Sequence, residues 1–189
     1  MKIHRPCGLG APVFLSGPPF RSEHGCAADR RAANGGYGVT RINVGALPIR
    51  KGSQYPPPLD GPCRDRIRQA LGDAAGLTQF GVNLLQLPPG CWSSQRHWHS
   101  GEDEFVWVLG GEVVLVTDKG EEVLRAGDCA GFKAGAPDGH HLKNCSGQVA
   151  IVLEVGSRRP GGDDVDYPDV DLRWSAATGP AHKDGTSYG

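Results

Sequence analysis

Short strand-like runs separated by turns fill the chain from residue 77 to residue 155, and they constrain its fold more than any other feature. The runs cover residues 77–87, 104–109, 112–117, 121–124 and 148–155. Asp118-Lys119-Gly120 lies between two of them and predicts a β-hairpin. The 189 residues include 29 glycines and 15 prolines, which is typical of a chain with many turns. Short strands without intervening helices predict an all-β sandwich or barrel.

The region before these runs has a different pattern. Apolar residues recur there at helical spacing, namely Ile67, Ala70, Leu71 and Ala74. They predict a short amphipathic helix from Asp65 to Ala75 that ends near Gly76. The stretch 38–44 is expected to be a lead-in strand.

Three segments follow from these patterns. Residues 1–37 show no sustained periodicity of apolar residues and are expected to be a poorly ordered extension. Residues 38–157 are expected to form the β-barrel domain. Residues 158–189, which are rich in aspartate, are expected to be a polar C-terminal tail that packs on the barrel.

Composition excludes several classes of protein. The chain has 20 basic and 21 acidic side chains, so its net charge is −1, and no basic stripe is present to bind nucleic acid. No run approaches the roughly 18 apolar residues of a membrane helix, and the N-terminal residues do not form a secretion signal. Six cysteines without Cys-x-x-Cys spacing favour reduced thiols. A cytoplasmic location is therefore expected.

His97, His99 and Glu104 are the residues that point to chemistry. On a strand, residues two apart share a face, so the two imidazoles would point the same way, with Trp98 on the other side. Glu104 begins the next strand-like run and can bring a carboxylate back toward them. Two imidazoles and a carboxylate suit a first-row divalent metal such as zinc, iron, manganese or nickel.

The spacing of these residues resembles the first sequence motif of the cupin superfamily. Gly90 is followed by six residues, then His97-Trp98-His99, four residues, Glu104, six residues and Gly111. The first spacer is one residue longer than is usual in the family. The segment 127–144 is similar to the second motif, although Lys133 stands where a proline is usual. The resemblance implies a jelly-roll barrel with one short helix and irregular terminal extensions.

The second motif implies a further histidine ligand, and two candidates are adjacent. The family's spacing to Asn144 selects His140 rather than His141. Alternation agrees, because His140, Leu142 and Asn144 would share one face, and His141 and Lys143 would lie on the solvent face. We therefore predict His140 as the ligand and keep His141 as the alternative.

A site of three histidines and one glutamate implies a single divalent ion with open coordination positions. We expect a metal-dependent enzyme that acts on a small metabolite, of the isomerase, lyase or dioxygenase type. The alternative is a non-catalytic cupin that binds a sugar or similar ligand as a sensor or store.

Gln95 shares the face of His97 and is a candidate substrate contact. Phe105 and Trp107 face away from Glu104 and are expected to pack on a sheet or in a dimer interface. The resemblance to the family implies a homodimer. Some relatives carry sugar-phosphate isomerase labels.

Overall fold

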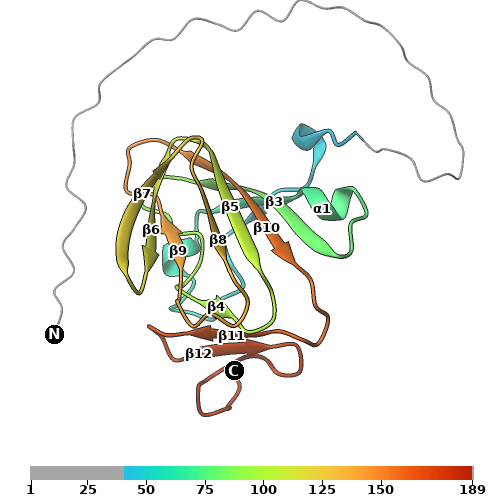
Figure 1. Ribbon diagram of the computed structural model, residues 1–189, viewed down its shortest axis with the longest axis vertical. Helices are drawn as coiled ribbons and strands as arrows, with labels where there is room; N and C mark the ends of the chain where they lie inside the picture. The colour runs from blue at the N-terminus through green and yellow to red at the C-terminus, as the bar shows by residue number, and fades with distance from the viewer. Residues whose placement is uncertain (1–40, 189) are drawn as a thin grey trace, which may run out of the picture. The chain divides into compact units, whose positions relative to one another are not determined.

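The computed structural model describes residues 41–188 of the chain, and the compact unit begins at Ile42 (Figure 1). The extension expected over residues 1–37 lies outside the described residues, as do residues 38–40 of the expected lead-in strand. The described part of that stretch, residues 41–44, contains no strand, and a 3-10 turn, Val44–Ala46, begins within it.

Most of the regular elements of the described structure are antiparallel strands, which form three sheets. The largest sheet has the order β1 (Arg50–Lys51), β2 (Ile67–Ala70), β3 (Phe80–Leu87), β10 (Ala150–Ser157), β5 (Glu104–Gly110) and β8 (Cys129–Phe132). The second contains β7 (Gly120–Arg125), β6 (Glu112–Thr117) and β9 (His141–Lys143). The third contains β13 (Gly179–Ala181), β12 (Leu172–Ser175), β11 (Asp164–Tyr167) and β4 (Trp98–His99). This confirms the predicted all-β jelly-roll barrel.

The main core lies inside the barrel, because alternate residues of facing strands point inward. Its fully buried members include Leu85, Leu87, Val108 and Val152. The predicted hairpin is confirmed, because β6 and β7 pair from Glu112↔Arg125 to Thr117↔Gly120. Predicted strands at 77–87, 104–109 and 148–155 correspond to β3, β5 and β10.

The helix predicted from Asp65 to Ala75 is largely wrong. Its first half is strand β2, which pairs with β3 from Ile67↔Gln86 to Ala70↔Asn83. Only Leu71–Ala74 forms α1, and a second 3-10 turn, Gly61–Cys63, precedes β2. Helical propensity over so few residues is weak, and pairing with the edge of β3 satisfies the backbone groups instead. As a result, Arg68 on β2 lines a cavity, together with the preceding Arg66.

The C-terminal residues are more ordered than the expected polar tail. Strands β11, β12 and β13 form a sheet to which β4, the strand of His99, is added through Val165↔His99 and Asp166↔Trp98. A second core supports this sheet, with Val165, Tyr167 and Leu172 buried. Figure 1 shows β11 and β12 alongside β4. The domain boundary expected at residue 157 stays a prediction.

Candidate metal centre

Backbone pairing places His97 and His140 next to each other. The two residues form an isolated antiparallel bridge, in which His97 N donates to His140 O at 3.1 Å and His140 N donates to His97 O at 2.8 Å. Their ring centroids are 4.9 Å apart. Phe132 stacks parallel to the His140 ring, with the two ring centroids 3.5 Å apart. Two histidines that are distant in sequence are thus fixed together by the strands.

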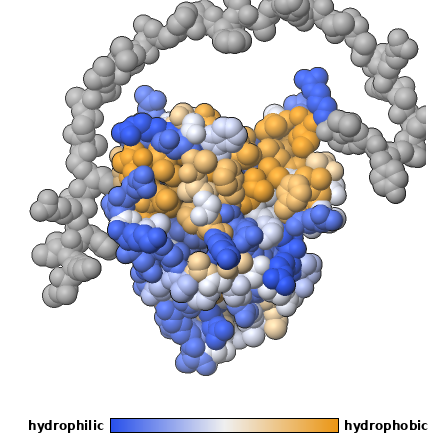
Figure 2. All heavy atoms as spheres, viewed as in Figure 1, coloured by the Kyte–Doolittle hydropathy of each residue, from blue (hydrophilic) through white to orange (hydrophobic). Residues whose placement is uncertain are grey.

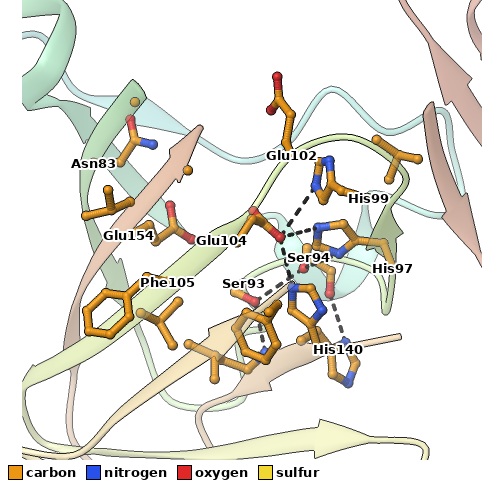
Figure 3. A pocket seen from close by; sticks show the side chains of 18 of the residues that line it. Asn83, Ser93, Ser94, His97, His99, Glu102, Glu104, Phe105, His140 and Glu154 are labelled. Carbon is orange, nitrogen blue, oxygen red and sulfur yellow. Dashed lines mark hydrogen bonds and ion pairs between the residues drawn. The ribbon is translucent and has the colours of Figure 1, made fainter. Parts of the chain in front are cut away.

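Glu104 is the point on which the histidines converge (Figure 3). Its Oε2 atom lies 2.9 Å from His140 Nε2, and 3.5 Å from the Nε2 atoms of both His97 and His99. Glu104 begins β5 and pairs with Gly156 on β10 and with Phe132 on β8, so strands on both sides fix its position in the largest sheet. The structure therefore brings all four predicted ligands to one place.

The spacing of these atoms fits the ligand shell of a divalent ion. Donor atoms about 2.1 Å from a metal lie about 3.0 Å apart in octahedral geometry and about 3.4 Å apart in tetrahedral geometry. The separations of 2.9 to 3.5 Å between Glu104 Oε2 and the three imidazole nitrogens fall close to this range. The donor atoms of His97, His99 and Glu104 all lie within 4.8 Å of one another. Neutral imidazole and carboxylate are also the donors that such ions prefer.

The protonation of the cluster suits metal binding. Burial alone would raise the pKa of Glu104, but hydrogen bonds and charge from the histidines outweigh it and hold that pKa well below its usual value. Burial lowers the pKa of His140, although its hydrogen bond to Glu104 opposes the shift. An ionised carboxylate and a neutral imidazole are the forms that bind a cation.

Asp163 holds His99 in position from outside the cluster. Its Oδ2 lies 2.6 Å from His99 Nδ1, and its Oδ1 accepts a hydrogen bond from the Gly101 backbone at 2.8 Å. This contact directs the other ring nitrogen of His99 toward Glu104. Gly101 is required here, because a Cβ atom would collide with the carbonyl oxygen of Gly162. Sequence reasoning missed Asp163, since nothing in an aspartate-rich segment shows which residue pairs with β4.

One expectation near the site needs correction. His141 is not on a solvent face: it is 3 % exposed, its Nδ1 lies 3.0 Å from Ser94 O, and Trp92 packs edge-on against it. Trp92 covers the face that was expected to be open, and Lys143 Nζ lies 5.0 Å from the same ring. Gln95 is also buried, and its amide donates to Leu59 O at 2.7 Å. Gln95 does not line the cavity beside the cluster, and its role as a substrate contact stays a prediction.

A cavity of about 340 Å³ adjoins the cluster and gives it access to a small ligand. His97, His99, Glu104 and His140 all line it. Tyr167 lines it as well, with its ring 5.7 Å from that of His97, and it packs edge-on against Tyr55. Burial raises the pKa of Tyr167, so its phenol stays protonated near neutral pH. The arrangement can hold a metal, a small molecule and a hydroxyl donor together.

Comparison with known proteins gives a consistent result. A family model described as "Cupin domain" matches residues 83–156. A structure from Silicibacter pomeroyi, described as a sugar phosphate isomerase from a cupin superfamily, is 42 % identical with a TM-score of 0.74, covering 79 % of this chain and 97 % of its own. A protein from Acidithiobacillus ferrooxidans, provisionally assigned as a sugar phosphate isomerase, is 34 % identical with a TM-score of 0.56, covering 59 % and 70 %.

A more distant structure shares the fold alone. It comes from Thermotoga maritima, is described as a predicted oxalate decarboxylase, and is 20 % identical with a TM-score of 0.53, covering 64 % of this chain and all of its own. No curated protein matches the chain. Among the described residues, no helix is long and apolar enough to cross a membrane.

Proposed function

The chain belongs to the cupin superfamily, and we propose that it is a metal-dependent enzyme that acts on a small metabolite at the site formed by His97, His99, Glu104 and His140. The observation that carries the proposal is the convergence of three imidazole nitrogens on one carboxylate oxygen beside a cavity. Four protein ligands leave coordination positions for substrate, and an open position distinguishes catalytic from structural metal sites.

The reaction that we favour is an isomerisation or a related lyase step. A bound divalent ion would polarise a carbonyl oxygen and stabilise negative charge next to it. The residues of the chain would hold the reactants: Asp163 orients His99, and Tyr167 offers a protonated hydroxyl within the cavity. The similarity to a sugar phosphate isomerase from Silicibacter pomeroyi supports this class of reaction.

A substrate panel tests the reaction class on the purified, metal-containing protein. If the protein is an isomerase, we expect it to contain zinc, manganese or nickel. We also expect it to incorporate deuterium from solvent next to a substrate carbonyl, which NMR measures. The isomerase reaction should consume no oxygen. Stoichiometric iron with substrate-dependent oxygen uptake would instead show a dioxygenase, which the same four ligands also suit.

A non-catalytic sensor or store for a sugar-like ligand is the competing function. It predicts that small ligands bind and raise the melting temperature without chemical change. A protein that neither contains nor takes up metal would remove the basis of the enzyme proposal.

A further inference from the structure

The cavity beside the metal centre continues into a second and larger one. The second cavity has a volume of about 750 Å³. The residues that line both cavities are Tyr55, Arg66, Arg68, Val165 and Tyr167. The two spaces therefore meet along β2 on one side and β11 on the other. A ligand at the metal centre can extend toward this junction.

The second cavity is strongly cationic. Its lining includes four basic side chains, Arg50, Lys51, Arg66 and Arg68, and none of its described lining residues is acidic. Lys51 pairs with Asp65 at 3.0 Å, but Asp65 does not line the cavity. Like charges gathered around a hollow with apolar walls focus a positive potential into it. This end of the space is suited to an anion.

Arg68 is the arginine at the junction with a hydrogen-bond donor to spare. Its Nη2 atom contacts the two carboxylate oxygens of Glu154 at 3.0 and 3.3 Å. Its Nε atom is buried and has no hydrogen-bond partner among the described residues. A buried N–H without a partner is costly, so such groups normally serve a ligand or another polar atom. Arg66 differs, because its Nε donates to Gly52 O at 2.9 Å and its Nη1 donates to Ser93 O.

Strand pairing brings Arg68 to the same side of the largest sheet as the metal centre. Arg68 lies on β2, but its contact with Glu154 places its guanidinium over β10. Strand β10 is next to β5, which begins with Glu104, and neighbouring strands lie about 4.8 Å apart. Figure 3 shows Glu154 and Glu104 on adjacent strands facing the same space. One molecule can therefore reach both groups.

We propose that Arg68 binds an anionic group, a phosphomonoester or a carboxylate, on a substrate whose other end lies at the metal centre. This inference rests on the proposed function for the metal end, and it names the class of substrate. Arginine is suited to the role because its guanidinium offers paired donors to phosphate or carboxylate oxygens. Glu154 competes with the anion for Arg68, and the surrounding cations guide the anion inward.

Calorimetric titration with three probes on the same six-carbon skeleton tests the proposal: glucose 6-phosphate, glucuronate and glucose. Each titration is done with metal-free and with metal-loaded protein. We expect at least one charged probe to bind about tenfold or more tightly than glucose, because hydrogen bonds to charged groups are strong. Comparison of the two charged probes shows whether the anion is a phosphomonoester or a carboxylate.

Variants show whether Arg68 is responsible. We expect Arg68→Gln to abolish the preference for charged probes and Glu154→Gln to increase it, since the competing carboxylate is gone. The double variant removes both members of the ion pair and should also lose the preference, which guards against an effect of an unpaired Glu154. Arg125→Gln, on exposed β7 where Arg125 pairs with Glu112, is the matched control and should change nothing.

Equal binding of charged and uncharged probes, or no binding of the charged probes, would overturn the proposal. A preference that persists in Arg68→Gln would also overturn it, because the anion would then be bound by the metal or by another cation. Metal content is measured in the same samples. A wild-type protein that neither contains nor takes up metal, but still shows Arg68-dependent binding of the anion, would contradict the proposed function alone, so the two failures are distinguishable.

Discussion

At the scale of single residues, the contact between Asp163 and His99 is the one that most clearly supports the candidate site from outside. Asp163 is buried and accepts hydrogen bonds from His99 Nδ1 and from the Gly101 backbone. A carboxylate behind a metal-binding histidine fixes the ring and increases its basicity. The His99 side chain is therefore held for binding before any metal arrives.

Asp163→Asn is predicted to weaken metal affinity by about 10- to 100-fold, because the amide keeps the shape but loses the charge. Competition with a chromophoric chelator measures the affinity. Asp164→Asn, at the exposed neighbouring position, is the control. Equal affinity in the wild type and in Asp163→Asn would show that the contact does not tune the site.

Buried His141 makes the free energy of unfolding of the protein depend on pH. Burial lowers its pKa from 6.5 to about 4, so the folded protein keeps it neutral while the unfolded chain takes up a proton below pH 6.5. The contribution is complete above pH 6.5 and is lost as the pH falls toward 4, and the shift corresponds to about 3 kcal/mol. Denaturant unfolding of metal-free protein at several pH values measures this loss. His141→Gln should show a smaller loss between pH 6.5 and 4; an identical pH profile would be contrary to this assignment.

The four candidate ligands could be predicted from the sequence because two short motifs contain them all. His-x-His spacing on a strand fixes a shared face, and Glu104 follows at a short offset. Asp163, Tyr167 and Arg68 could not be predicted, because each reaches the site through pairing between distant strands. The positions of these residues in the sequence do not show which strands pair.

At the scale of elements, the C-terminal sheet is part of the site rather than an appendage. Strand β11 pairs with β4, the strand of His99, and β11 ends at Tyr167, while Asp163 directly precedes it. Its packing depends on the second core around Leu172, which is 1 % exposed. The C-terminal sheet, which lies outside the main barrel, therefore helps to hold the candidate metal ligands in position.

Leu172→Ala is predicted to cost about 2 to 5 kcal/mol of unfolding free energy, as is usual for a buried leucine, and also to weaken metal binding. Leu124→Ala on β7 removes the same side chain from the main core. It should destabilise the protein to a similar degree but leave metal affinity unchanged. Both quantities can be measured by denaturant unfolding and chelator competition, and equal effects on metal affinity would refute a specific role for the C-terminal sheet.

Strands β3, β5, β6, β7 and β10 could be predicted, because their apolar patterns and the turn at Asp118-Lys119-Gly120 are local signals. Strand β2 was mistaken for a helix because its apolar residues also fit helical spacing, and only its pairing with β3 decides between the two. The C-terminal strands are short and polar, so their pattern resembles that of a tail. Tertiary pairing determines such elements more than local propensity does.

At the scale of the whole molecule, the outer face of the largest sheet is unusually apolar for a surface. Phe105 is 38 % exposed and Trp107 is 45 % exposed, and Leu109 and Ile151 lie on the neighbouring positions of β5 and β10. Figure 2 shows apolar residues concentrated over this part of the compact unit. A patch of this kind is typical of a protein interface.

We predict that two copies associate through this face, and that Trp107→Glu shifts the protein toward the monomer, because a charge would be buried in the interface. Sedimentation velocity measures the oligomeric state. Trp174→Glu, at a similarly exposed tryptophan on β12, is the control and should not change it. A wild-type protein that sediments as a monomer would contradict the prediction.

The metal content of the purified protein and its variants is the most direct test of the account. We predict one divalent ion per chain by plasma mass spectrometry, with loss of the ion in Glu104→Gln and in His97→Ala, because these side chains converge on one point. Glu121→Gln, on β7 and outside the cluster, should retain it. A wild-type protein that binds no divalent metal, or variants that keep a full equivalent, would contradict the assignment of the site.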